Sequence, residues 1–325
     1  MPTFSAIEAA AALIYRTLAP TPQIAWPLLA QRCGCDVWVK QENHLPTGAF
    51  KVRGGLVYLD WLRRTQPDVP GVIAATRGNH GQSIACAARA QGLPATLVVP
   101  HGNSPEKNRA MRAYGATLVE HGRDFAEALA HARTLAAEQG LHFVPSFDDR
   151  LVLGVATYAL ELFRAVPHLD RVYVPIGLGS GICGTLAARD ALGLETEIVG
   201  VVAAEAPAYA LSLAAGHPVS TEAIPDTLAD GVACRVPDPD AFARIRAGVS
   251  RIVRVTEPEI RAAMRHYFTD THQVAEGAAA LPLAAALQAG ERERPSSSDA
   301  PRRIALIHSG GNVDADRFAA VLGGE

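Results

Sequence analysis

Short runs of almost continuously apolar residues alternate along this chain with longer stretches rich in alanine and leucine. Strands of a parallel sheet that is covered on both faces have this character, and the longer stretches are typical of helices. We therefore predict an α/β fold with open, twisted, mostly parallel sheets flanked by helices. The predicted strands are residues 36–40, 72–75, 96–99, 117–120, 171–175, 197–202 and 304–307, and the clearest helices are residues 125–139, 155–165 and 182–192.

The size and charge of the chain narrow the class of protein. Its 325 residues are more than one hydrophobic core usually serves, which suggests about two domains. Hydrophobic residues make up 49%, charged residues make up 19%, and the formal net charge is -3. These values favour a globular enzyme and predict neither a nucleic-acid nor a membrane partner. The five cysteines are odd in number and scattered, which predicts free thiols in a reducing compartment, the cytoplasm.

A lysine, Lys51, follows a turn of small residues and stands at the start of a predicted helix. The amino end of a helix disfavours a cation, so the position favours the neutral, nucleophilic amine that imine chemistry requires. Most lysines are solvated surface charges, however, and this feature does not identify a catalytic residue by itself.

Three further motifs lie where a predicted strand ends. Residues 75–83 contain Gly78-Asn79-His80-Gly81, a turn whose free backbone N–H groups suit an anion, although a tight connection explains it equally well. Residues 174–184 contain four glycines in eight residues, and such backbone can wrap closely around a phosphate, with the hydroxyl of Ser180 as an added donor. Ser309 follows the last strand, where ligand contacts gather in open α/β sheets.

The same glycine-rich loop admits a second interpretation. Residues 179–184 match the dinucleotide pattern G-x-G-x-x-G, and Glu205 closes the next strand, so a nicotinamide-dependent oxidoreductase is an alternative. The late position of the loop and the proline at residue 175 count against it. It also leaves Lys51 and the Asn79 turn unexplained.

The four motifs, in this order, resemble the fold-type II pyridoxal-phosphate (PLP) family, and most of all its serine/threonine dehydratase (threonine ammonia-lyase) branch. The similarity runs from about residue 20 to the C-terminus. It implies a tryptophan synthase β-like fold with a small domain at residues 47–149 and a large PLP-binding domain formed by residues 1–46 and 150–325. It also implies a homodimer and a small amino-acid substrate.

The resemblance implies a role for each matching residue. Lys51 would form the Schiff base with PLP and then remove the Cα proton. Phe50 would pack on the pyridine ring, the side chain of Asn79 would bind the phenolic oxygen, and Ser309 would contact the pyridine nitrogen. The phosphate loop would consist of Gly177, Leu178, Gly179, Ser180 and Gly181, and the substrate pocket of Thr76, Arg77, Asn79 and His80. We assign no metal site, because Glu205 lacks the aspartate that accompanies it in metal-binding relatives.

The implied activity is β-elimination of water from a β-hydroxy amino acid such as threonine or serine, which gives a 2-keto acid and ammonia. A β-replacement transferase similar to cysteine synthases is an alternative. Arg77 stands where the branch usually has a serine, which argues against racemase activity and raises the hypothesis of an extra anionic group on the substrate; an Arg77 turned to solvent is the other interpretation. Val155 stands where a glutamine is usual, which motivates the hypothesis of an aryl substrate such as phenylserine.

Overall fold

The computed structural model describes residues 2–290 and 302–324 and contains two separate β-sheets. The first sheet has six strands in the order β1-β2-β10-β7-β8-β9, and all of its neighbouring strands are parallel except β1 and β2. Its strands are β1 (Gln23–Ala25), β2 (Asp36–Gln41), β7 (Arg171–Pro175), β8 (Glu197–Ala203), β9 (Arg251–Val255) and β10 (Arg303–His308).

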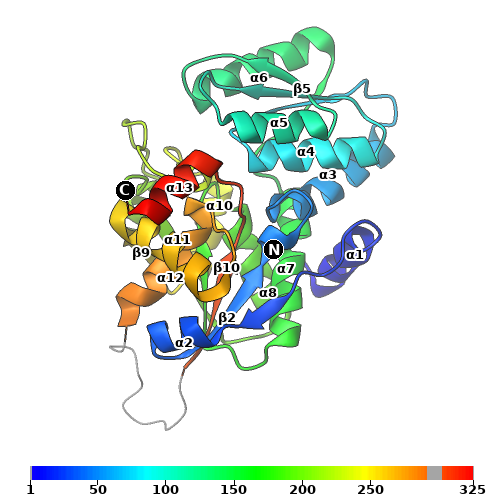
Figure 1. Ribbon diagram of the computed structural model, residues 1–325. Helices are drawn as coiled ribbons and strands as arrows, with labels where there is room; N and C mark the ends of the chain where they lie inside the picture. Colours follow the sequence, from blue (N-terminus) through cyan, green and yellow to red (C-terminus); the bar gives the residue numbers. More distant parts are fainter. Residues whose placement is uncertain (1, 291–301, 325) are drawn as a thin grey trace.

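The second sheet has four parallel strands in the order β5-β4-β3-β6. Its strands are β3 (Val72–Ala75), β4 (Ala95–Val99), β5 (Thr117–Glu120) and β6 (His142–Phe143). This sheet therefore comes from residues 72–143 and lies within the predicted small domain. Figure 1 shows it as an upper unit above the six-stranded sheet. The boundaries at residues 47 and 149 stay a prediction.

All seven predicted strands are present, and the predicted fold class is confirmed. Three strands were not predicted. β1 is a three-residue antiparallel edge strand and β6 has only two residues, so neither gives a recognisable apolar run. In β9, the charged residues Arg251 and Arg254 interrupt the apolar pattern, because this strand lies at the edge of its sheet.

Helices cover both faces of the six-stranded sheet. Alternate strand residues face opposite layers: Tyr173 belongs to one hydrophobic core, and its neighbours Val172 and Val174 belong to the other. The first layer contains α2 (Pro27–Cys33), α11 (Glu257–Thr271), α12 (Gly277–Ala289) and α13 (Ala315–Gly323). The second contains α7 (Asp149–Ala165), α8 (Ser180–Ala191) and α10 (Pro239–Gly248). Two further helices, α1 (Phe4–Ile14) and α9 (Ala208–Ala215), pack at the periphery, with α1 against α7.

The four-stranded sheet is covered in the same way. Its first layer contains α3 (Lys51–Thr65), α4 (Asn79–Ala90) and α5 (Pro105–Ala113), and α6 (Phe125–Gln139) covers the opposite face. Helix α3 packs against both α4 and α7, so it connects the two halves of the molecule (Figure 1). Lys51 is its first residue, as predicted.

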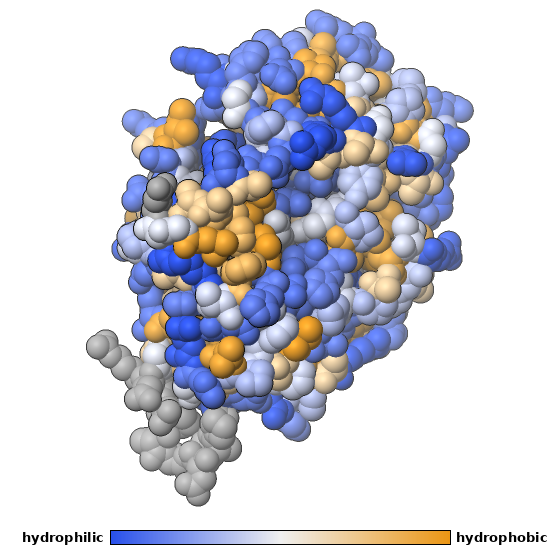
Figure 2. Space-filling view, viewed as in Figure 1, coloured by the Kyte–Doolittle hydropathy of each residue, from blue (hydrophilic) through white to orange (hydrophobic). Residues whose placement is uncertain are grey.

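The surface in Figure 2 is mostly polar, with a small group of apolar side chains in the area of α13. In the part of the chain that the structure describes, no helix is long and apolar enough to cross a membrane.

Candidate functional site

The loop before Lys51 pairs with the loop after β10. The backbone N–H of Phe50 donates to the carbonyl of Ser309 at 3.1 Å, and that of Gly311 donates to the carbonyl of Gly48 at 2.9 Å. Gly48 has a φ of +66°, in the left-handed region that favours glycine. A Cβ at this position would also lie 2.5 Å from Oδ1 of Asn312. Glycine is therefore required for the pairing that brings the first and fourth motifs together.

The amine of Lys51 lies beside the glycine-rich loop. Its Nζ donates to Oγ of Ser180 at 2.9 Å and lies 5.0 Å from the centre of the Phe50 ring. Burial lowers the pKa of Lys51 to about 8, against an opposing contribution from Glu276. With this pKa, about a tenth of the amine is neutral and nucleophilic at pH 7, far more than in an ordinary lysine.

The glycine-rich loop joins β7 to α8 and is built to bind an anion. Among the described residues, no protein acceptor receives a hydrogen bond from any backbone N–H of residues 177–182. The N–H groups at the start of α8 carry the positive end of the helix dipole. Gly179 has a φ of +107°, and a Cβ on Gly177 would lie 2.6 Å from the carbonyl oxygen of Gly231. These two glycines are thus required by the loop itself.

Leu178 and Gly181 complete this loop without blocking it. The carbonyl of Leu178 accepts a hydrogen bond from the hydroxyl of Tyr209 at 3.0 Å, and its side chain packs on the core. A Cβ on Gly181 would lie 3.5 Å from the Phe50 ring, an ordinary contact. Phe50 in turn packs edge-to-face on Tyr158, with ring centres 6.0 Å apart. The aromatic side chain that was predicted to face a cofactor ring is therefore fixed next to the anion loop.

The turn from β3 to α4 is organised by Thr76. Its hydroxyl accepts hydrogen bonds from the backbone N–H groups of Gly78 and Gly81 at 3.0 and 2.9 Å. Neither of the two intervening N–H groups, at Asn79 and His80, has an acceptor among the residues that the structure describes. Those two donors can receive a carboxylate.

His80 lies close to Lys51 and is held in its neutral form. The pKa of His80 is lowered to about 3, mainly by burial and also by the charge of Lys51, while a hydrogen bond with the backbone of Val144 opposes both effects. Its buried Nε2 has no hydrogen-bond partner in the described structure. A ligand in the site can therefore use this nitrogen.

Two functional candidates were missed by the sequence reasoning. Nδ2 of Asn79 donates to Oε1 of Glu276 at 2.7 Å, and Oδ1 of Asn79 accepts from Nδ2 of Asn312 at 2.8 Å. Together these bonds fix which way the Asn79 amide points and leave one of its N–H hydrogens available. Asn312 lies inside the predicted motif after β10, but Glu276 precedes an alanine-rich helix and no sequence signal marked it.

Glu276 is a buried carboxyl group at the junction of the two halves. Burial raises the pKa of Glu276 to about 7; the charge of Lys107 opposes this effect and that of Asp230 adds to it. Lys107 pairs with Asp230 at 2.6 Å across the same junction. Oε2 of Glu276 is buried and has no hydrogen-bond partner in the described structure, so a ligand can form a hydrogen bond with it.

Ser309 and Arg77 differ in their surroundings. Ser309 is 3% exposed, and its hydroxyl has no hydrogen-bond partner among the described residues. Arg77 is exposed, and its side chain makes no hydrogen bond or ion pair within the described ranges. Its predicted place in the substrate pocket therefore stays a prediction.

Val155 lies in the protein core. It packs from α7 against α8, where a Cβ on Gly184 would lie 3.0 Å from Val155 Cγ1, and its own exposure is 1%. The preceding Gly154 faces the backbone of Arg53. The identity of residue 155 thus gives no support for a larger substrate pocket.

A buried network of charges fixes the first turn of α3. Arg53 contacts Glu42 at 2.7 Å and Glu161 at 2.6 Å, and Lys40 contacts Glu161 at 2.5 Å. Thr157 accepts a further hydrogen bond from Arg53 at 3.1 Å. Because Arg53 is two residues after Lys51, this network anchors the backbone that carries the candidate lysine.

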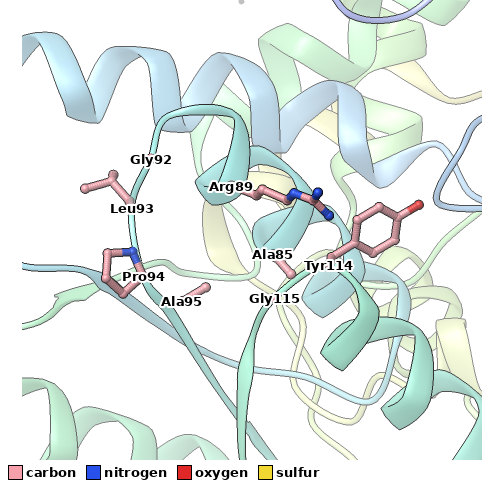
Figure 3. A pocket seen from close by; sticks show the side chains of 8 residues that line it. All are labelled: Ala85, Arg89, Gly92, Leu93, Pro94, Ala95, Tyr114 and Gly115. Carbon is pink, nitrogen blue, oxygen red and sulfur yellow. The ribbon is translucent and has the colours of Figure 1, made fainter.

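A surface depression of about 360 Å³ lies in another place, and Figure 3 shows the side chains that line it. It lies at the amino end of β4, whereas the site described above lies at the carboxyl ends of the strands. Its Tyr114 hydroxyl already donates to the carbonyl of Pro46 at 2.6 Å. The lining residues are Ala85, Arg89, Gly92, Leu93, Pro94, Ala95, Tyr114 and Gly115.

Comparisons with known proteins agree with this geometry. Residues 14–310 match the family described as pyridoxal-phosphate dependent enzyme. An L-threonine ammonia-lyase from Geobacter sulfurreducens is 37% identical over 294 residues, which are 90% of this chain and 71% of that protein. A solved threonine deaminase from T.th. has a TM-score of 0.87 and 34% identity, covering 96% of this chain and 99% of that one. Maize serine racemase has a TM-score of 0.90 and 27% identity, with 99% and 97% covered.

The fold, the partly buried lysine and the anion loop define an α/β enzyme that uses PLP. The chain belongs to the family of PLP-dependent enzymes and has the fold-type II architecture. The predicted family and cofactor are therefore confirmed, and the nicotinamide alternative is set aside. Within the described residues, no group of three or more His, Cys, Asp or Glu side chains is arranged to hold a metal ion.

Proposed function

We propose that this chain is a PLP-dependent ammonia-lyase that eliminates water from a small β-hydroxy amino acid. The Cα proton and the β-hydroxyl leave the substrate, and hydrolysis of the resulting enamine consumes one water and releases a 2-keto acid and ammonia. PLP supplies the electron sink that stabilises the carbanion at Cα. The names of the relatives, L-threonine ammonia-lyase and threonine deaminase, support this reaction type.

The observation that carries the proposal is the position of Lys51. Its amine has a lowered pKa and lies 2.9 Å from Ser180 in a loop whose backbone N–H groups are available for a phosphate. Lys51 binds the cofactor covalently and, when free, takes the Cα proton. A general base works best when its pKa lies near the operating pH, which this amine satisfies.

The other residues bind and orient. The backbone of Gly177, Leu178, Gly179, Ser180 and Gly181 holds the cofactor phosphate, and Phe50 packs on the ring. Ser309 presents a neutral hydroxyl to the pyridine nitrogen, which leaves that nitrogen largely unprotonated and favours elimination over transamination. Asn79 binds the phenolic oxygen through its remaining N–H hydrogen.

The substrate carboxylate lies at the turn from β3 to α4. The free backbone N–H groups of Asn79 and His80 receive it, and Thr76 holds the turn in shape. Arg77 lies at the outer edge of this pocket. It replaces the serine that would serve as a second acid/base group in a racemase, so we propose elimination without racemisation.

Ammonia release tests the proposed reaction. Purified protein loaded with PLP is assayed with both stereochemistries of serine, threonine, phenylserine and hydroxyaspartate, and the keto acid is measured in parallel. We expect equal amounts of ammonia and keto acid, and a fall in kcat on the order of 10³-fold in Lys51→Ala. Arg64→Ala changes an exposed residue of the same helix and is expected to retain activity.

Two results would contradict the proposed reaction. A protein that releases no ammonia from any of these amino acids is not a lyase of this class. A protein that converts O-acetylserine and sulfide to cysteine, without releasing ammonia from hydroxy amino acids, is the β-replacement enzyme instead. Preference for phenylserine over threonine would support the aryl-substrate hypothesis, although the buried position of Val155 does not explain such a preference.

We infer that the enzyme works in the cytoplasm as a homodimer. The five cysteines all lie in the described part of the chain and form no disulfide bond there, in line with a reducing compartment. The dimer rests on resemblance to the family, and light scattering of the purified protein tests it.

A further inference from the structure

The side chain of Ser180 is not needed for the task that its loop performs. A phosphate loop binds through backbone N–H groups, and the resembling dehydratases usually have glycine at this position. Here a hydroxyl is present, 2% exposed, at the first residue of α8. Burying an added hydroxyl is unfavourable unless it makes a hydrogen bond, and the bond that it makes is with the amine of Lys51.

We propose that Ser180 is a positioning residue that holds the amine of Lys51 whenever that amine is not covalently bound. This inference rests on the proposed function, in which Lys51 alternates between a covalent bond and a free amine. Ser180 Oγ, at 2.9 Å from the amine, is its one hydrogen-bond acceptor among the described residues.

A hydroxyl suits this task better than a carboxylate. No carboxylate of the described residues lies within ion-pair distance of Lys51, and Glu276 acts on it only through its longer-range charge. A direct carboxylate partner would hold the amine as an ammonium ion, which is not a base. A hydroxyl accepts one hydrogen bond from the amine and still has its own hydrogen to donate.

The surroundings leave Ser180 little freedom. Its backbone begins α8, the preceding Gly179 has a Cβ position only 2.8 Å from the side chain of Ala241, and Gly181 faces Phe50. The neighbours of Ser180 therefore have no side chain of their own. In this loop, Ser180 is the one residue whose polar side chain contacts the lysine.

The chain has three lysines, which makes the test unusually direct. They are Lys40, Lys51 and Lys107, and none of them is exposed. Competitive labelling of the cofactor-free protein with acetic anhydride across pH 6–10, followed by peptide mass spectrometry, reports the reactivity of each amine separately. Lys40 and Lys107 serve as internal references in each sample.

Four proteins are compared: wild type, Ser180→Gly, Ser180→Ala and Ser180→Thr. Removing a hydrogen bond that stabilises a buried ammonium favours the neutral amine, so the apparent pKa of Lys51 should fall by about one unit in the Gly and Ala variants. Ser180→Thr keeps the hydroxyl and should restore the wild-type profile. Circular dichroism checks that each variant is folded, and Ser180→Gly carries the glycine that is usual for the loop.

Kinetics and cofactor titration complete the test. We expect Ser180→Gly to bind PLP within about threefold of wild type, because the backbone donors remain, and to lose about tenfold or more in kcat with little change in KM. If Lys51 in the Gly and Ala variants were labelled with the same pH dependence as in wild type, the proposal would be overturned. A large loss of PLP affinity with unchanged labelling would also overturn it, because Ser180 would then be a phosphate ligand only. Because the labelling uses cofactor-free protein, it still tests the contact between Ser180 and Lys51 if no ammonia is released and the proposed function fails.

Discussion

The carboxylate of Glu276 accepts a hydrogen bond from the side-chain amide of Asn79 at 2.7 Å, across 197 positions of sequence. This bond joins the first turn of α4 to the loop before α12. It places a buried carboxyl group near enough to Lys51 for its charge to act on the pKa of that lysine.

The stability of the protein should depend on pH through Glu276. Burial raises the pKa of Glu276 from 4.5 to about 7, so the folded state binds its proton more tightly than the unfolded state does. The resulting stabilisation is complete below about pH 4.5 and is lost as the pH rises through about 7. Between pH 5 and pH 8, the free energy of unfolding of wild type should fall by roughly 2–3 kcal/mol relative to that of Glu276→Gln. Urea unfolding at both pH values measures this, and parallel pH dependence in the two proteins would refute it.

Asn312→Ala should weaken cofactor binding. The Asn312 amide donates to Oδ1 of Asn79 at 2.8 Å and to the carbonyl of Thr47 at 2.8 Å, and without it the Asn79 amide is held by its bond to Glu276 alone. Loss of one such hydrogen bond should raise the Kd for PLP about tenfold in an absorbance titration. Gln288→Ala is the control, because its exposed amide also donates two hydrogen bonds, to Arg254 and Glu259. A similar loss in both variants would mean that the effect is not specific to Asn79.

Gly48→Ala should destabilise the protein more than Gly92→Ala. Both glycines have almost the same backbone conformation, with φ of +66° and +67°, so both variants incur about 1–2 kcal/mol of strain. A Cβ at Gly92 meets nothing within 4 Å, whereas a Cβ at Gly48 lies 2.5 Å from Asn312. We expect a further loss of about 1–3 kcal/mol for Gly48→Ala in urea unfolding. Equal losses of unfolding free energy in the two variants would show that the loop at Gly48 accommodates a Cβ by a small shift and that glycine is not required there.

Arg53→Ala should be strongly destabilising, because it leaves the buried carboxylates of Glu42 and Glu161 with Lys40 as their one remaining cationic partner among the described residues. Removing one partner of a buried ion pair costs about 3–5 kcal/mol. Arg64→Ala breaks an exposed ion pair with Asp60 on the same helix and should cost less than about 1 kcal/mol. Thermal and urea unfolding of the two variants give the comparison. A small effect of Arg53→Ala would show that the network of buried charges does not hold the backbone that carries Lys51.

Much of the fold followed from local patterns in the sequence. Buried parallel strands such as β7 have a nearly continuous apolar run, and each of the predicted runs forms a strand. The edge strand β9 could not be recognised in this way, because Arg251 and Arg254 lie where the sheet meets solvent. Whether a strand residue meets solvent depends on the position of its strand in the sheet, and the local sequence pattern carries no information about that position.

The candidate site was predictable only where residues cluster in motifs. Glu276 was missed because its partner Asn79 is distant in sequence, and a lone glutamate before an alanine-rich helix is unremarkable. Sequence could not show the surroundings of Val155, because helical geometry turns it toward α8 while its neighbour Gly154 faces α3. Lysines in general lie on protein surfaces, but here none of the three is exposed, so the general expectation was wrong for this chain.

The central claim is that Lys51 carries the cofactor and is released by the substrate. Borohydride reduction of the PLP-loaded protein, followed by peptide mass spectrometry, tests it most directly. We predict a pyridoxyl adduct on Lys51, none on Lys40 or Lys107, and a loss of this adduct when a hydroxy amino acid is added before reduction. An adduct on either of the other lysines, or no adduct on any lysine, would contradict the account.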